Sequence, residues 1–215
     1  MPSAPQHPPV VRLPPPKLGR GRTLAESLRR RRTIREISDR KLSLQMLSNL
    51  LWAACGTNRR RGPFGYGGIT AASASNSQEI DVYVALEDGV YFFDAEQHRL
   101  APAAAGDLRE LAIGRGQRSS VEMKAPVQLI YVADLHRLTH TRGFQEPGLH
   151  DPEVQKSYYY VDTGLIAANV YLFAASQGLA CWFHNCDKPA LTERLRLGAE
   201  QRVLFAQSVG YPERS

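Results

Sequence analysis

The spacing of apolar side chains predicts two helices near the start of the chain. Thr23 and Glu26 have the spacing of a capping box, which opens a helix that runs through Leu28. From Leu44 to Ala54, apolar residues recur three and four positions apart, as on one face of a helix. Gly56 follows at the place of a left-handed residue that ends such a helix. We expect the second helix to lie in the core.

The longest predicted helix covers Val154–Gln177 and ends at Gly178. One stripe of this helix is apolar and consists of Val161, Leu165, Ala168, Leu172 and Ala175. Further apolar residues lie around the circumference at Ile166, Val170 and Phe173, so we expect burial on more than one side. Either a central position in the core or a dimer interface would satisfy this pattern.

Alternating and continuous apolar runs predict the strands. Residues 80–86 alternate between the two faces of a strand, Asp88-Gly89 forms a tight turn, and residues 90–93 return as the second strand of a hairpin. Further strands are expected at residues 127–133, 179–183 and 203–209. Short helices are expected at residues 107–113 and 191–197, the latter preceded by Asp187 as its N-cap.

Three segments show neither the helical nor the strand spacing of apolar residues. Residues 1–22 hold seven prolines, which disfavour helix and ladder hydrogen bonds and suit an extended arm. Residues 59–68 are rich in arginine and glycine, and residues 136–152 contain His136, His140 and His150, so we interpret both as loops. The histidine spacing does not match a metal site. We therefore predict one domain over residues 23–215 behind a proline-rich arm.

Charge and cysteine content narrow the class of protein. The net charge of +6 is concentrated in residues 29–35 and 59–61, which favours local anion sites over a nucleic-acid surface. Three cysteines are too few for a disulfide framework, and no metal ligand set is recognisable, so we expect a reducing, cytoplasmic setting. No apolar run approaches the ~18 residues of a membrane span, and the N-terminus has no signal-peptide core.

Two polar segments are candidates for a binding site. Residues 29–35 carry five arginines and Thr33, a set able to hold a phosphate or a polarised ring edge, although a solvated helix end would look the same. Residues 71–78 collect small, hydroxyl and amide side chains before a strand, which suits close contact with a ligand or merely a polar loop. No nucleophile is apparent, since Cys181 and His184 have no readable activating context.

Several motifs, in their order, resemble the flavin-dependent nitroreductase superfamily, and the likeness extends from Leu24 to Pro212. Arg31-Arg32-Thr33-Ile34-Arg35 is similar to the family pattern R-R-S-x-R, and Ser73–Gln78 is similar to its P-S-x-x-N-x-Q loop, with Ala72 in place of the proline. The other matching segments are Leu50–Gly56 with Asn58-Arg59, Gln177–Ala180, and Val209–Pro212.

This resemblance implies an α+β fold with a mixed, mostly antiparallel sheet flanked by helices, and a homodimer with FMN at its interface. Residues in the matching positions would bind FMN. Arg31 and Thr33 would hold its phosphate and ribityl chain, with Arg32 and Arg35 near the phosphate or the pyrimidine edge. Ser73, Ala74 and Asn76 would come from the second subunit, supported by Gln78. Phe183, His184 and Asn185 would lie beside the flavin-ring nitrogen that accepts the hydride.

The resemblance also implies the reaction. The expected activity is hydride transfer from NAD(P)H to a small-molecule acceptor, a nitroaromatic, a quinone or a similar compound, by a ping-pong mechanism. FMN would carry out the chemistry, so no catalytic side chain is required. Two alternatives remain open at this point: an azoline-oxidising dehydrogenase of the same superfamily, and a non-catalytic flavin-binding protein.

Overall fold

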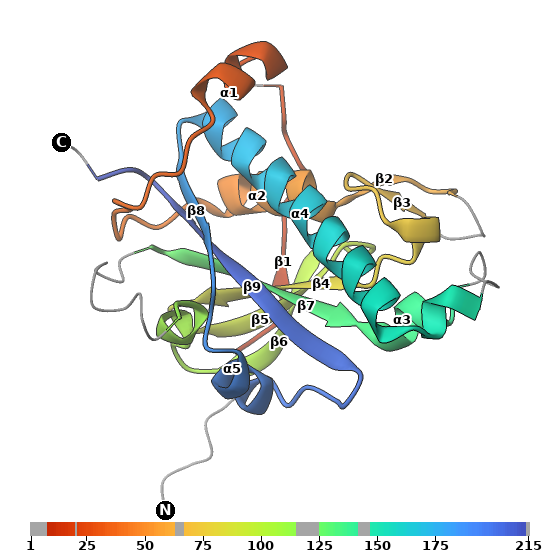
Figure 1. Cartoon of the computed structure of the whole chain (residues 1–215). Coiled ribbons are helices and arrows are strands. Elements are labelled where there is room, and N and C mark those ends of the chain that lie inside the picture. The colour runs from red at the N-terminus through yellow and green to blue at the C-terminus, as the bar shows by residue number, and fades with distance from the viewer. Residues whose placement is uncertain (1–7, 20, 63–66, 115–124, 142–146, 214–215) are drawn as a thin grey trace, which may run out of the picture.

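A seven-stranded sheet forms the frame of the computed structural model, which describes residues 8–19, 21–62, 67–114, 125–141 and 147–213 (Figure 1). The strand order is β1-β6-β5-β4-β7-β9-β8, and every pair of neighbours is antiparallel. The strands are β1 (Val11–Arg12), β4 (Ile80–Leu86), β5 (Gly89–Asp94), β6 (Arg99–Ala105), β7 (Val127–Asp134), β8 (Ala180–His184) and β9 (Gln201–Gly210).

Helices cover both faces of this sheet. The helices are α1 (Leu24–Arg30), α2 (Leu44–Cys55), α3 (Leu135–Thr139), α4 (Pro152–Gln177) and α5 (Lys188–Arg194). The 3-10 segments among the described residues are η2 (Ala74–Asn76), η3 (Arg109–Ala112) and η4 (Pro147–His150). A small separate sheet pairs β2 (Thr57–Arg59) with β3 (Gly68–Ile69). No helix within the described ranges is long and apolar enough to span a membrane.

The alternation of side chains along the central strands creates two cores. In β4, Val82 and Val84 face the larger core, which α2 and α4 cover, whereas Tyr83 and Ala85 face a smaller core closed by η3 and α5. Figure 1 shows α2 and α4 on one side of the sheet and α5 at the other. Burial on both faces explains why the strand runs are so apolar.

Most of the predicted elements are confirmed. Thr23 and Glu26 form the capping box of α1. Gly178 ends α4 with φ 71°, a left-handed conformation that favours glycine, and Asp187 caps α5. The hairpin is present as β4 and β5, with Leu86 opposite Gly89. The structure has the predicted α+β class.

Other local predictions are wrong. Gly56 has φ −71° because α2 runs directly into the extended β2, so the left-handed cap expected there does not form. The helix predicted at residues 107–113 is only the four-residue 3-10 segment η3. The segments interpreted as loops contain β2 and β3 at the ends of residues 59–68, and α3 and η4 within residues 136–152. Helix α3 begins at an N-cap, Asp134, that lies in the preceding strand.

The proline-rich arm also contains a strand, contrary to the expected absence of ladder bonds. Val11 pairs with Leu100 at the edge of the sheet, and the prolines lie outside this two-residue strand. Its partner β6 was not predicted, because Pro102 interrupts the apolar run and is accommodated by a register shift beside Val90. Leu13 of the arm is buried in the larger core.

Helix α4 is buried on one side only within this chain. Its core side chains include Ile166, Val170 and Phe173. In the predicted apolar stripe, Val161 is 60% exposed and Leu165 is 41% exposed. The stripe therefore lies outside the core of the single chain. Of the two positions expected for this helix, the single chain does not show the central one, and the dimer interface stays a prediction.

Candidate functional site

The hydroxyl group of Tyr171, on α4, joins two of the predicted site segments. It lies 2.9 Å from the backbone nitrogen of Phe183, which donates, and 3.1 Å from the hydroxyl of Thr33. Because Tyr171 accepts from Phe183, its own proton is available for Thr33. The guanidinium of Arg31 lies 5.5 Å from the centre of the Tyr171 ring. The basic segment and the end of β8 thus meet at one side chain.

Backbone contacts hold the basic segment against β8. Helix α1 is capped at its C-terminal end by Arg31, whose N–H donates to the carbonyl of Ser27. The N–H of Ile34 donates to the carbonyl of Cys181 at 3.0 Å. Ile34 packs into a small apolar cluster with Ile37 and Ala180. In an extended chain alternate side chains share a side, so Arg31, Thr33 and Arg35 lie opposite Ile34.

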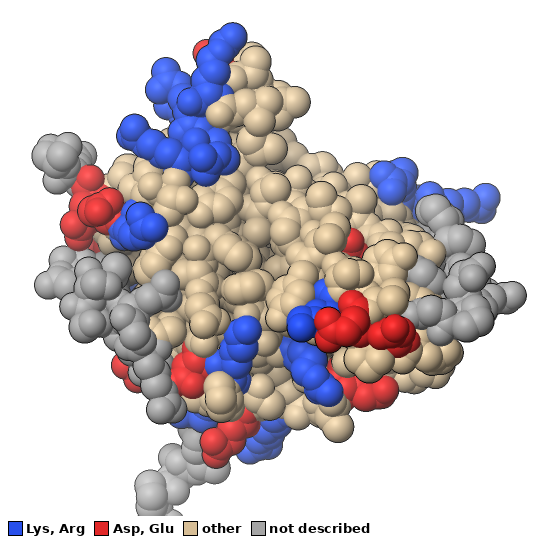
Figure 2. Space-filling model, in the orientation of Figure 1, with Lys and Arg blue, Asp and Glu red and all other residues tan. Residues whose placement is uncertain are grey.

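The arginines of this segment remain available to an anion. Arg31, Arg32 and Arg35 are exposed, and no carboxylate among the described residues forms an ion pair with them. Figure 2 shows Lys and Arg side chains gathered over α1 and the segment after it. Arg35 lies 5.5 Å from the centre of the Trp182 ring, which keeps it beside β8. These donors suit a phosphate group.

The predicted residues at the end of β8 differ in their surroundings. Phe183 is half-buried and Asn185 is exposed, but His184 is buried and points inward. Its Nε2 lies 2.8 Å from the Ser208 hydroxyl, and its Nδ1 lies 3.0 Å from the Asn185 carbonyl oxygen. Burial lowers the pKa of His184 to about 4, so the ring is neutral at pH 7. Its side chain therefore supports the segment from inside.

The second predicted segment, Ser73–Gln78, forms a tightly folded loop. Ser75, Asn76 and Gln78 have φ of 48°, 57° and 49°, which is unusual outside glycine. The side-chain amides of Asn76 and Gln78 both donate to the carbonyl of Gly67, and the Ser73 hydroxyl accepts the N–H of Gln78. The loop conformation is therefore fixed by its own polar residues.

One contact attaches this loop to α4. The N–H of Ala74 donates to a carboxylate oxygen of Asp162 at 2.9 Å. Behind Asp162 lies the fully buried Glu79, whose carboxylate accepts from the Ser77 hydroxyl at 2.5 Å. Burial and the neighbouring Asp162 raise the pKa of Glu79 to about 7.

The single chain brings the predicted residues into two groups, not one. Arg31, Thr33 and Phe183 meet at Tyr171, whereas the Ser73–Gln78 loop meets α4 at Asp162. These two positions are nine residues apart on one helix, which corresponds to about 14 Å at 1.5 Å per residue. The exposed side chains of Val161 and Leu165 belong to the same helix as these two positions.

The sequence alone did not identify Tyr171, Asp162 and Glu79 as residues that support the candidate site. Tyr171 follows Val170 in an apolar stretch and reads as a core aromatic residue until its hydroxyl partners are known. Asp162 gave a usable signal, because it is an acidic residue within the apolar part of a long helix and is now seen to be buried. Glu79 immediately precedes an apolar strand, where an acid would ordinarily be solvated.

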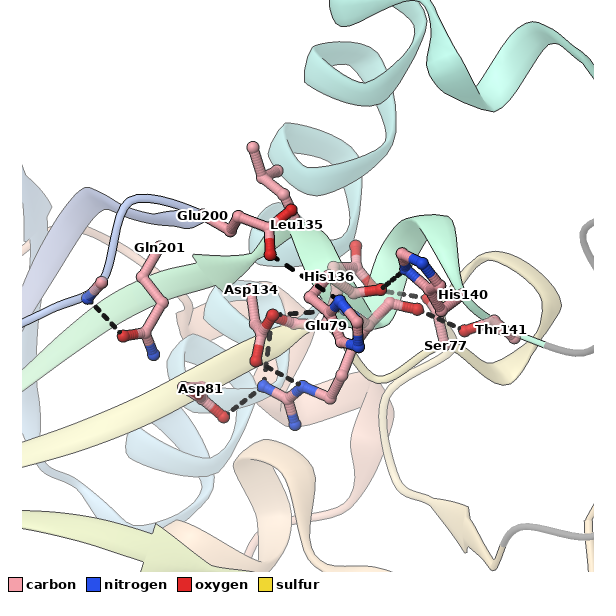
Figure 3. Close-up of polar contacts among 12 residues, drawn as sticks. Ser77, Glu79, Asp81, Asp134, Leu135, His136, His140, Thr141, Glu200 and Gln201 are labelled. Carbon is pink, nitrogen blue, oxygen red and sulfur yellow. Dashed lines mark hydrogen bonds and ion pairs between the residues drawn. The ribbon is translucent and has the colours of Figure 1, made fainter.

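The cysteines and histidines do not form a second reactive centre. All three cysteines are reduced and buried, and burial raises the pKa of Cys181 to about 12, so it is not a nucleophile at neutral pH. His136 of α3 and His140, which caps the end of this helix, stack with ring centres 4.0 Å apart, and His136 lies next to Glu200 (Figure 3). Within the described residues, no group of three potential metal ligands is found.

Comparison with known proteins identifies the family of this chain. A family model described as the nitroreductase family matches residues 28–211. The chain belongs to the nitroreductase family, as the resemblance of its motifs predicted.

Individual relatives agree with this assignment. A protein of Methanocaldococcus jannaschii named as a candidate nitroreductase is 32% identical over 164 residues, which cover 73% of this chain and 75% of the relative. The structure of a candidate nitroreductase from Ralstonia eutropha is 31% identical, with a TM-score of 0.81 over 96% of this chain and 90% of that one. An NADPH:FMN oxidoreductase from Vibrio harveyi, complexed with NAD+, shares the fold at 20% identity, with a TM-score of 0.60 over 89% of this chain and 69% of that one.

Proposed function

We propose that this member of the nitroreductase family is a homodimeric FMN-dependent oxidoreductase that takes reducing equivalents from NAD(P)H and passes them to a nitroaromatic, a quinone or a similar acceptor. The observation that carries this proposal is the meeting of Arg31, Thr33 and Phe183 at Tyr171. It joins an anion-binding segment to the strand end that the family resemblance assigns to the flavin ring.

The residues present fit FMN. Arg31 and Thr33 offer charged and hydroxyl groups to the phosphate and ribityl chain, and the neighbouring Arg32 adds to the positive charge of the segment. Arg35, held near Trp182, would place a fixed positive charge near the pyrimidine edge of the ring. When bound, FMN supplies the hydride chemistry, so the protein's task is to bind, orient and tune it.

A homodimer is supported by the exposed apolar side chains beside the site. Leu24 and Leu28 on α1 are 66% and 58% exposed, and Val161 and Leu165 on α4 add to them. Helices α1 and α4 pack against each other, and apolar side chains exposed on adjoining helices are candidates for an interface. A second copy over α4 would enclose the two groups of site residues and bring the Ser73–Gln78 loop of one subunit toward the arginines of the other.

The test is a visible absorption spectrum of the purified protein, followed by anaerobic titration with NADH and with NADPH. The expected result is a flavin spectrum that is bleached by one or both nicotinamides and restored by an electron acceptor in a separate step. Protein that is colourless, does not take up added FMN and is monomeric by size would overturn the proposal. FMN that binds but is not reduced would leave a non-catalytic flavin-binding protein.

A further inference from the structure

The Ser73–Gln78 loop has a conformation that needs support from outside. Three of its non-glycine residues have positive φ, a backbone state that persists only where the surroundings enforce it. Its hydrogen bonds, within the loop and to the carbonyl of Gly67, fix its shape, but they do not join it to α4. That place is set where Asp162 accepts the N–H of Ala74.

Asp162 does not stand alone in the interior. It is 4% exposed, and its carboxyl group interacts with that of Glu79, which has no exposed surface. Two ionised carboxylates in contact, away from water, repel each other strongly. Oε1 of Glu79 is buried and has no hydrogen-bond partner among the described residues, so a proton on this carboxyl group would remove the repulsion and give Glu79 a hydrogen atom to donate to Asp162.

No other described charge takes over this role. Arg137 of α3 approaches the Glu79 backbone, where its Nη2 donates to the carbonyl oxygen at 3.4 Å. The guanidinium of Arg137 forms ion pairs with the carboxylates of Asp81 and Asp134, which are labelled in Figure 3. The Ser77 hydroxyl donates to the Glu79 carboxyl group and favours its ionised form. The proton on Glu79 is thus controlled by two neighbours. The carboxyl group of Asp162 favours its presence, and the hydroxyl of Ser77, which donates to Glu79, favours its loss.

We propose that Glu79 and Asp162 are positioning residues that hold the Ser73–Gln78 loop through one shared proton, so that losing this proton loosens the loop and weakens its hold on FMN. The inference rests on the proposed function only in taking FMN as the ligand of the loop. Since the pKa of Glu79 is raised to about 7, the proton is present in mildly acidic solution and is lost in mildly alkaline solution.

The first experiment measures the FMN dissociation constant of the apoprotein from pH 6 to pH 9, by quenching of flavin fluorescence, for the wild type and Glu79→Gln. The glutamine amide donates to Asp162 at every pH. We expect wild-type affinity to fall by on the order of tenfold over this range, the equivalent of about one pKa unit of coupling, and the variant to change less than about twofold. Equal pH profiles for the two proteins would overturn the proposal.

Ser77→Ala tests the same proton through the midpoint of the pH profile of FMN affinity, which a merely structural role of Glu79 and Asp162 would leave unchanged. Removing the hydroxyl deletes a hydrogen bond that favours the ionised form of Glu79, so the midpoint of the pH profile should shift to higher pH. A midpoint that stays in place, or one that moves to lower pH, would contradict the shared proton. This variant also keeps the test decisive if Glu79→Gln folds poorly.

A third measurement separates this inference from the proposed function. Hydrogen exchange at the Ala74 amide, expressed as a protection factor in FMN-free protein, should fall between pH 6 and pH 9 in the wild type and stay constant in Glu79→Gln. If FMN does not bind at any pH, the proposed function fails, while the Ala74 result still decides whether the proton holds the loop. Unchanged Ala74 protection in the wild type would overturn the inference even if FMN binds.

Discussion

Tyr171 accepts the backbone N–H of Phe183 at 2.9 Å, and this contact ties the last part of α4 to the end of β8. The same hydroxyl reaches Thr33 at 3.1 Å, so the segment with the arginines is fixed to the same point. A strand end and an exposed basic segment, which belong to distant parts of the sequence, are thereby held in one geometry before any ligand arrives.

Tyr171→Phe should therefore lower both the stability of the fold and the affinity for FMN. It removes the hydroxyl that pairs with both Phe183 and Thr33, and a lost hydrogen bond of this kind costs about 1–3 kcal/mol when its partner stays buried. We expect a fall of a few degrees in the melting temperature and an FMN affinity lower by roughly tenfold. Thermal unfolding and FMN titration measure the two effects.

The matched control is Tyr160→Phe, a half-buried tyrosine of the same helix whose ring packs against Phe205. The same hydroxyl is removed far from the arginines, so FMN affinity should stay within about twofold of the wild type. If both variants lose affinity equally, Tyr171 has no special place in the site.

Arg31→Ala and Arg35→Ala should impair different properties of the protein, FMN affinity in the first and the flavin reduction potential in the second. A charge-assisted hydrogen bond to phosphate contributes about 1.5–3 kcal/mol, so Arg31→Ala should weaken FMN binding by roughly ten- to a hundredfold. Arg35→Ala should bind FMN with a smaller loss but lower its reduction potential, because a nearby cation stabilises the anionic reduced flavin.

Dissociation constants and redox titrations of both variants decide between these roles. Arg29→Ala, which removes the same charge from the last turn of α1, controls for a general loss of positive potential. Equal losses of affinity with unchanged potentials in Arg31→Ala and Arg35→Ala would mean that the two roles are wrongly assigned.

Leu165→Glu tests the exposed face of α4. Leu165 is 41% exposed in the single chain, so a charge there should leave the folded monomer intact, as judged by circular dichroism. In a dimer interface the same charge would be desolvated, which typically costs several kcal/mol. We expect the variant to sediment as a monomer and to lose FMN.

Val10→Glu introduces the same charge at an exposed apolar residue of the N-terminal segment, where Val10 is 48% exposed. It should leave the sedimentation coefficient and FMN content unchanged. A Leu165→Glu variant that is still dimeric would show that the subunits meet elsewhere.

The sequence predicted the elements whose signals are local. The capping box at Thr23, the hairpin at residues 80–93 and the left-handed Gly178 depend on neighbouring residues, and the structure has all three. Strand β6 was missed because Pro102 breaks its apolar pattern, and only pairing with β5 through a register shift makes it a strand. Likewise, Gly56 is extended because strand β2 begins at the next residue.

The candidate site follows the same division. The motif residues Arg31–Arg35 and Ser73–Gln78 could be selected from the sequence because their side-chain types gather within short segments. The side chains that hold them could not, because Tyr171 and Asp162 act through hydrogen bonds to residues about 90 to 140 positions away in the chain. Such long-range partners leave no periodic signal.

The buried imidazole of His184 should make stability fall in mild acid. Its pKa is lowered from 6.5 to about 4 by burial, so the unfolded chain binds a proton in this interval that the folded protein excludes. Stability from this group is therefore present above pH 6.5 and is lost as pH falls toward 4, by roughly 2–3 kcal/mol at most. The measurement is the free energy of unfolding by urea at several pH values between 7 and 4.

The slope of unfolding free energy against pH separates the contribution of His184 from that of acidic residues that titrate in the same pH range. His184→Gln cannot take up the proton and can still pair with Ser208, so its stability should decline less steeply between pH 6.5 and pH 4 than that of the wild type. Replacing the exposed His150 by glutamine should leave the slope unchanged. Parallel profiles for the wild type and His184→Gln would show that the buried ring takes up its proton in the folded protein as easily as in the unfolded chain, and would place the origin of acid sensitivity elsewhere.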